Sequence, residues 1–202
     1  HAYLKYMEKK NIILVHNGIN QNIYKNKNLI RKKQIIAVGE FKEEKGFEYL
    51  IEAFSNLKKN DNFKDYSLLI IGDGRLRKEF EKQIQSLNMT NFIYLPGSKN
   101  REELINLYNQ SEVFVLSSIS EGFPKVLLEA ISCGCKIVST DCGSASSVLK
   151  DIKLARPKIT EDLTTGLSDC IESKSKTNID IGEFTWESVL KVYYDEYKDI
   201  NL

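Results

Sequence analysis

The segment EGFPKVLLEA, residues 121–130, combines residue types that could bind a charged ligand. Gly122 frees the backbone ahead of an apolar helical pattern, and Pro124 suits the first turn of a helix because its missing N–H costs nothing there. The amides of Phe123 and Lys125 could then face an anion, which the helix dipole favours, and phosphate is the ligand best matched to them. An ordinary helix start without a ligand is the alternative.

Two carboxylates frame this segment. Glu129 lies inside the apolar run 126–131, where a carboxylate is costly unless it is paired or accepts hydrogen bonds. Two sugar hydroxyls could supply those bonds; alternatively, the side chain points to solvent. Glu121 comes eight residues earlier, just before the helix, so the two carboxylates can reach opposite ends of one ligand. Their spacing does not indicate a glycosidase pair, because Glu129 sits well inside the helix.

Short β-rich runs alternate with longer helical patterns along the chain. Strands are predicted at 12–15, 35–38, 68–71, 92–95, 113–116 and 136–139, with a weaker signal at 152–155. Helices are predicted at about 46–58, 76–87, 101–109, 124–133, 161–173 and 184–197.

This alternation predicts an α/β fold, a doubly wound parallel sheet of the Rossmann-like type with helices on both faces. Right-handed crossovers place the carboxyl ends of all strands at one edge, where ligands bind in such folds. The loops that follow the strands should therefore meet in a single crevice. These loops contain Gly39, residues 72–74, 96–98, 117–122 and 140–143.

Composition narrows the function classes. The chain has 202 residues, 42% of them hydrophobic, and a formal net charge of +1, so a nucleic-acid partner is not expected. No apolar run approaches the roughly 20 residues of a membrane span, and no signal-peptide pattern opens the chain. The four cysteines lack metal-ligand spacing, and only two histidines are present. The sequence thus predicts a cytoplasmic protein without a metal site, and peripheral contact with the inner face of the membrane is left open.

Segment 121–130 resembles the Glu-x7-Glu motif of the group 1 retaining glycosyltransferases, which have the GT-B architecture of two Rossmann-like domains. Further segments resemble that family in order and spacing, so that the likeness covers about residues 12–150. They are HNGIN at 16–20, VG and EKGF within 38–47, IGDG at 71–74, LY to VLSS within 107–118, and AISCGCKIVSTD at 130–141.

The resemblance implies a role for each matching position. Glu129 would accept hydrogen bonds from the ribose hydroxyls of a donor nucleotide, and Glu121 would hold the hydroxyls of the transferred sugar. Lys45 would neutralise the diphosphate leaving group, which matters most as the bond breaks. For Lys45 alone, an ordinary surface lysine is the alternative. The donor would be a nucleotide-diphosphate sugar, with no cofactor and no metal.

The remaining predicted positions would line the donor. Glycines would let the backbone approach the ligand, although a simple turn is the alternative for those of the 72–74 loop. Ser98 would border the base, and the start of the helix near 124 would share the diphosphate. The full predicted binding set, besides Glu129, is Gly39, Gly72, Gly74, Ser98, Gly122, Phe123, Pro124, Lys125 and Val126.

The chain also departs from the family pattern. Glu40 stands where the family commonly has arginine, and an acid near a diphosphate is unhelpful unless it turns away. Lys42, on the same loop, is a candidate substitute. Ser147 stands where the family often has glutamate. These changes bear on donor affinity and sugar identity more than on the fold.

The resemblance predicts three parts. Residues 1–16 correspond to the end of a preceding domain and a linker, 17–182 to the donor-binding domain, and 183–202 to a helix that packs back towards the preceding domain. That acceptor-binding domain is not in this sequence, so the fragment alone is expected to be inactive. The whole protein would transfer a hexose or N-acetylhexosamine, most simply from a UDP-sugar, to a glycan or lipid-linked acceptor of a bacterial surface polysaccharide such as capsule or lipopolysaccharide.

Three other classes of protein fit the sequence less well. A nucleotide-binding module that has lost catalysis shares every feature except turnover. A nucleotide-sugar epimerase of the same architecture is a further alternative. A signalling receiver needs clustered acids after its first strand, which Gly39 and Glu40 do not supply.

Overall fold

The computed structural model describes residues 15–150, 152–173 and 179–200. Most of the predicted strand 12–15 therefore lies outside the described residues, and so does nearly all of the predicted linker 1–16.

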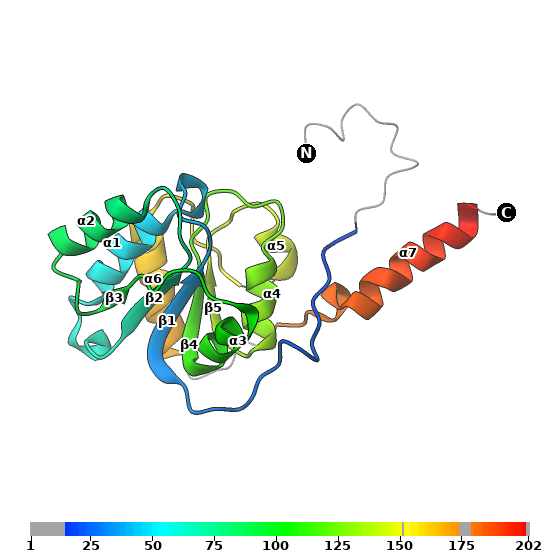
Figure 1. The fold of residues 1–202 in the computed structure, drawn as a ribbon, viewed down its shortest axis with the longest axis horizontal. Helices are drawn as coiled ribbons and strands as arrows, with labels where there is room; N and C mark the ends of the chain where they lie inside the picture. The colour runs from blue at the N-terminus through cyan, green and yellow to red at the C-terminus, as the bar shows by residue number, and fades with distance from the viewer. Residues whose placement is uncertain (1–14, 151, 174–178, 201–202) are drawn as a thin grey trace.

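Within the described residues, five strands form one sheet, and all of them are parallel, as the sequence predicted (Figure 1). They lie in the order β3-β2-β1-β4-β5. From β1 the chain first adds β2 and β3 on one side, and then crosses back to add β4 and β5 on the other side of β1. This arrangement creates a topological switch point between β1 and β4, the place where ligands bind in open parallel sheets. The strands are β1 Lys32–Val38, β2 Ser67–Ile71, β3 Ile93–Tyr94, β4 Ser111–Leu116 and β5 Lys136–Ser139.

Helices cover both faces of the sheet, which confirms the doubly wound fold. One core cluster joins the sheet to α1 Phe47–Leu57, α2 Arg77–Ser86 and α6 Thr160–Glu172. A second joins the opposite face to α3 Arg101–Gln110, α4 Lys125–Ser132 and the short α5 Ala145–Val148. Central β4 is buried from Val113 to Leu116, as expected for a strand packed on both faces.

The helix starts follow from local chemistry. Asn100 and Glu103 form a reciprocal capping box at the start of α3, with bonds of 3.0 and 2.9 Å. Gly46 begins α1 with a positive φ of 60°, and a Cβ there would lie 2.4 Å from the carbonyl oxygen of Ser117. Glycine is therefore required where the loop before α1 meets the loop after β4.

The predicted strand at 152–155 is wrong. Only Ala155 pairs with the sheet edge, through a single bridge to Thr140. The side chains of Ile152 and Leu154 pack instead against the second core cluster. Segment 152–156 and residues of β5 line one cavity, so the segment reaches the edge strand at a single residue and no ladder forms.

The last helix, α7 Trp186–Ile200, projects away from the sheet (Figure 1). It starts two residues later than predicted, because Gly182–Phe184 form a 3-10 turn and Phe184 is buried in the second core cluster. The start of α7 is tied to the first described segment, since the amide of Ile19 donates to Phe184 O at 2.7 Å. Beyond this tie the helix exposes Leu190, Val192, Tyr193 and Tyr194.

Candidate functional site

The loop after β1 docks onto the loop after β4. Its 3-10 turn, Glu43–Lys45, accepts two bonds from that loop: Ser117 Oγ donates to Lys45 O at 2.9 Å, and the Ile119 amide donates to Glu44 O at 2.8 Å. Lys45 is thereby held at the switch point between β1 and β4.

Lys45 and Glu121, separated by 76 positions in the sequence, form a close ion pair. Lys45 Nζ lies 2.6 Å from Glu121 Oε1, and the same oxygen accepts a 2.7 Å bond from Ser118 Oγ. The side chains are only 18% and 12% exposed, so water screens this pair less than it screens a surface pair. The structure therefore brings together the two residues predicted to be catalytic.

The loop after β5 also reaches this place. Glu121 forms a parallel bridge with Gly143, and its amide donates to Cys142 O at 2.9 Å. Buried Thr140 donates through Oγ1 to Ser118 O at 2.5 Å. The loops after β1, β4 and β5 thus converge at one edge, as fold geometry predicted.

Glu129 lies in the middle of α4, partly buried against α3. The hydroxyl of Tyr108 donates to Glu129 Oε2 at 3.1 Å, and the Tyr24 hydroxyl is a second donor to the carboxylate. Burial raises the pKa of Glu129 above its ordinary value, although both tyrosines favour the charged form. Burial and the nearby carboxylate raise the pKa of Tyr24 to about 12 and that of Tyr108 well above its ordinary value, so both hydroxyls stay protonated and able to donate.

The glycines predicted to admit a ligand lie where backbones approach closely. A Cβ on Gly72 would sit 1.9 Å from Gly39 O, and one on Gly74 would sit 2.7 Å from Phe41 O. Close packing of loops is thus a sufficient reason for glycine at 72 and 74. Gly39, Gly72 and Ser98 also line a shallow depression of about 280 Å³ at the ends of β1 and β2.

The backbone at the start of α4 is less available to a ligand than the sequence suggested. The sequence predicted Pro124 in the first helical turn, but α4 begins one residue later, at Lys125, and Pro124 is its N-cap. The Lys125 amide donates to Phe123 O at 3.1 Å, so a ligand would have to displace that bond. Gly122 is open, because a Cβ there would have no atom within 4 Å, while Val126 packs against the second core cluster.

Phe123 is fixed by aromatic neighbours. Its ring centroid lies 5.3 Å from that of His16 and 5.8 Å from that of Phe184, and His16 and Phe184 are 5.2 Å apart. This trio links the loop before α4 to both segments that meet at Ile19. No pattern in the sequence indicated it.

Glu40 lines the depression at the ends of β1 and β2, beside Gly39 and Gly72. Its side chain is 66% exposed and pairs with Lys42 at 3.4 Å. Asp73 caps the amide of Gly74 and pairs with Arg77, whose hydrogen bond lowers the pKa of Asp73. Within residues 15–150, 152–173 and 179–200, no group of three or more His, Cys, Asp or Glu side chains is placed to hold a metal ion.

Sequence reasoning missed three residues that contact the predicted carboxylates: Ser118, Tyr108 and Tyr24. Ser118 lies in a loop that was expected to border the crevice, so its hydroxyl was the available signal. Tyr108 lies on the buried face of α3 and is fully buried, which is typical of a core residue. Tyr24 lies 105 positions before Glu129, and no local pattern connects the two.

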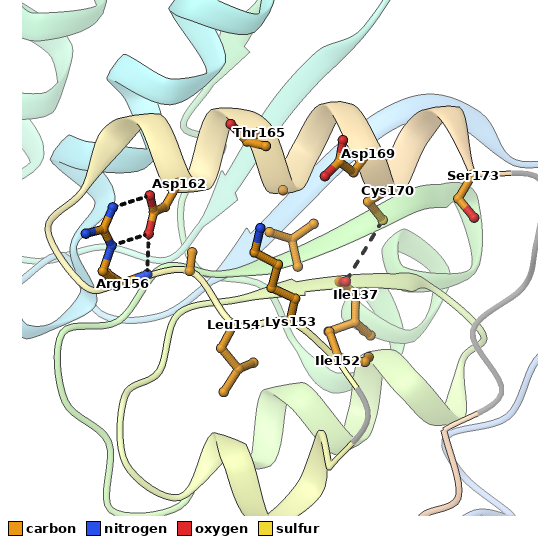
Figure 2. A pocket seen from close by; sticks show the side chains of 13 residues that line it. Ile137, Ile152, Lys153, Leu154, Arg156, Asp162, Thr165, Asp169, Cys170 and Ser173 are labelled. Atoms are coloured by element: carbon orange, nitrogen blue, oxygen red, sulfur yellow. Dashed lines mark hydrogen bonds and ion pairs between the residues drawn. The ribbon is translucent and has the colours of Figure 1, made fainter.

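A larger cavity lies elsewhere. It has a volume of about 670 Å³ and opens between the free edge of β5, segment 152–156 and α6 (Figure 2). None of its 13 lining residues belongs to the predicted site. Its lining combines apolar side chains, such as those of Ile137 and Leu154, with charged ones, and the ion pair of Arg156 and Asp162 lies at one end. We place the candidate site at the switch point, where charged and hydrogen-bonding side chains converge.

The parallel sheet with helices on both faces defines a Rossmann-like class of α/β domain. A family model described as "Glycosyl transferases group 1" matches residues 20–184. The chain belongs to this family.

The chain is also similar to several known proteins. One curated relative is 34% identical over 107 residues. Another, an N-acetylgalactosaminyltransferase of Campylobacter jejuni that acts on a diphospho-undecaprenol-linked saccharide, is 32% identical over 120 residues. That match covers 59% of this chain and 31% of the Campylobacter protein. The solved C-terminal domain of a group 1 glycosyl transferase from Francisella tularensis has 20% identity and a TM-score of 0.70, covering 87% of this chain and 98% of that one. Anabaena HepE, solved with UDP and glucose, has 19% identity and a TM-score of 0.78, covering 92% of this chain and 56% of that one.

The two structural matches show the fold, a Rossmann-like domain of the GT-B type. The chain spans 25% to 55% of the length of the first four curated relatives. Among the described residues, no helix combines the length and apolar character needed to cross a bilayer.

Proposed function

We propose that this chain is the donor-binding domain of a retaining glycosyltransferase that takes a hexose or N-acetylhexosamine from a UDP-sugar. The observation that carries the proposal is the convergence of Lys45 and Glu121 at the switch point, 2.6 Å apart. A cation and a carboxylate side by side match the diphosphate and the sugar hydroxyls of such a donor. HepE of the same fold was solved with UDP and glucose.

Each charged group has a task in this proposal. Lys45 stabilises the charge that develops on the diphosphate as the glycosidic bond breaks, and the amides at the start of α4 share that charge. Glu121 accepts hydrogen bonds from the sugar hydroxyls. No step in the proposal requires a metal ion or another cofactor.

Glu129 is the proposed ribose contact. Tyr108 donates to its Oε2, which fixes the orientation of the carboxylate on α4. A ribose diol would then supply the further hydrogen bonds that a partly buried carboxylate needs. The raised pKa of Glu129 fits a group whose partners are incomplete without a ligand.

We further propose that α7 packs against a preceding acceptor-binding domain. Its exposed side chains, Leu190, Val192, Tyr193 and Tyr194, are apolar or aromatic, and such a surface favours association. The acceptor would be a glycan or lipid-linked saccharide, similar to the diphospho-undecaprenol-linked saccharide named for the Campylobacter relative. The product of the present protein would enter a bacterial surface polysaccharide. In the cell the whole protein would work in the cytoplasm, at the inner face of the membrane where a lipid-linked acceptor is reached.

Calorimetric titration of the chain with UDP, GDP and ADP tests donor recognition. We expect UDP to bind, Glu129→Ala to weaken binding at least tenfold, and Glu79→Ala, a change at an exposed glutamate on α2, to leave it unchanged. No binding of any nucleotide at millimolar concentration would refute the proposal. A longer protein that contains this chain, binds UDP-sugar and shows no transfer or donor hydrolysis would instead be a non-catalytic nucleotide-binding module.

A further inference from the structure

The positive charge of Lys45 is already partnered in the described structure. Glu121 Oε1 accepts from both Lys45 Nζ at 2.6 Å and Ser118 Oγ at 2.7 Å. Ser118 is 1% exposed, so its hydroxyl is a fixed donor. A phosphate that approaches Lys45 must therefore share the ammonium group with a carboxylate that is held in place.

Two ligands of related structure would meet this pair differently. In a nucleoside-diphosphate sugar the terminal phosphate is esterified, and sugar hydroxyls follow it. A free nucleoside diphosphate ends in a phosphate that carries additional negative charge near neutral pH, since its second pKa is about 6. If that phosphate binds Lys45, its additional charge would face the Glu121 carboxylate with no hydroxyl donors between the two anions. Like charges this close are mutually destabilising in a site that is mostly shielded from water.

Glu121 has room for the sugar. Its hydrogen bonds from Lys45 and Ser118 both end on Oε1, and across the described parts of the chain no donor is bonded to Oε2. A carboxylate accepts several hydrogen bonds, and Lys45 has three N–H donors. Sugar hydroxyls can therefore bind Oε2 while Lys45 turns a donor towards the phosphate.

We propose that Glu121 makes this site select nucleoside-diphosphate sugars over free nucleoside diphosphates, by competing with phosphate for Lys45 unless sugar hydroxyls engage the carboxylate. The inference rests on the proposed function and adds a specificity to it. The same competition would lower the affinity of the site for the nucleoside diphosphate that remains after the sugar has been transferred.

Isothermal titration of the 202-residue chain with UDP, UMP, UDP-glucose and UDP-N-acetylglucosamine tests this inference. Glu121→Gln keeps the shape of the side chain and removes its charge. We expect UDP to bind this variant about tenfold more tightly than the original chain, or about 1.4 kcal/mol. Both UDP-sugars should bind equally or less tightly, and UMP should be unaffected because it has no β-phosphate.

The chain offers a matched control. Glu112 also pairs with a lysine, Lys136, at 3.1 Å, and accepts a 2.7 Å hydrogen bond from the hydroxyl of Tyr66. Its side chain is 23% exposed. It lies near the amino end of β4, whereas the candidate site lies at the carboxyl ends of the strands. Glu112→Gln should leave the ratio of the UDP and UDP-sugar dissociation constants unchanged. Ser118→Ala removes one of the two donors to Glu121 and keeps its charge, so the carboxylate depends more on Lys45, and that ratio should shift in the direction opposite to Glu121→Gln by about two- to threefold.

The outcomes separate the two proposals. If Glu129→Ala abolishes UDP binding while Glu121→Gln tightens neither ligand or tightens both equally, the selectivity role of Glu121 is overturned and donor binding stands. If UDP binds no variant, both are overturned. Circular dichroism of each variant shows that the compared proteins are folded, and Ser118→Ala supplies the decision should Glu121→Gln fail to fold.

Discussion

The hydroxyl of Tyr108 on α3 donates a 3.1 Å hydrogen bond to Oε2 of Glu129 on α4. Tyr108 is fully buried, so this bond joins the hydrophobic core of the domain to a carboxylate proposed to bind ribose. Tyr24 approaches the same carboxylate from the segment that precedes β1. Three distant parts of the chain thus fix one candidate ligand-binding group.

Glu129→Gln should stabilise the unliganded chain at neutral pH. Burial raises the pKa of Glu129 above its ordinary value of 4.5, so the folded chain holds the proton more tightly than the unfolded chain. The free energy of unfolding therefore falls as pH rises from that value through the raised pKa, and the cost is fully present above it. A glutamine at this position removes the free-energy cost of burying the charged carboxylate. Groups kept for ligand binding commonly lower stability in this way.

Thermal unfolding between pH 4 and pH 8 measures this effect. The Tm of Glu129→Gln should exceed that of the original chain by a few degrees at pH 7, given about 2–4 °C per kcal/mol for a chain of this size, and the difference should vanish below pH 4.5. Glu79→Gln, at an exposed position, is the control and should show no pH-dependent difference. A Glu129→Gln variant that is less stable at pH 7 would contradict the burial argument.

Gly72→Ala should destabilise the edge of the sheet where the candidate site lies. Its φ is 142°, and a Cβ would lie 1.9 Å from Gly39 O, a backbone atom that cannot move aside cheaply. We expect a loss of about 3 kcal/mol in the free energy of unfolding, measured by urea denaturation. Gly122→Ala is the control, because its Cβ would have nothing within 4 Å, and equal losses in the two variants would rule out the steric explanation.

Arg31→Met should separate α3 from the end of α4. The Arg31 guanidinium donates to Tyr108 O at 3.0 Å, to Ser111 O at 2.6 Å and to Cys133 O at 2.6 Å. Partly buried carbonyls that lose a charged donor cost free energy, so we expect a loss of at least about 2 kcal/mol. Urea denaturation measures it, with Arg75→Met as a control at an exposed ion pair that should leave the midpoint unchanged. An unchanged midpoint for Arg31→Met would show that these bonds are replaced by water.

Gly18→Ala should displace the only tryptophan of the chain. A Cβ on Gly18 would lie 2.6 Å from Cδ2 of Trp186, which is already 43% exposed. We expect a red-shifted emission maximum and stronger acrylamide quenching, with a stability loss under about 1 kcal/mol because the contact is peripheral. Gly122→Ala should leave the emission unchanged. An identical spectrum in Gly18→Ala would mean that the helix start moves as a unit with the 15–19 segment.

The amino-acid sequence by itself determined the order of elements, the parallel sheet and the edge at which the loops meet. Strands β1, β2, β4 and β5 were predictable because each is a contiguous apolar run that ends in glycine or small polar residues. The edge followed because parallel strands with right-handed crossovers align their carboxyl ends. Glu121 and Glu129 were candidates because of their types and their spacing within one segment, whereas Lys45 was a candidate only through the resemblance to the family.

The tertiary structure decided what those residues touch. The ion pair of Lys45 and Glu121 joins positions 76 apart, and the contacts of Glu129 with Tyr24 and Tyr108 join elements on three parts of the chain. The strand predicted at 152–155 did not form, because only Ala155 reaches the sheet edge while the half-buried Ile152 and Leu154 pack against the second core cluster. Local patterns encode local conformation, whereas partners distant in sequence are chosen by how whole elements pack.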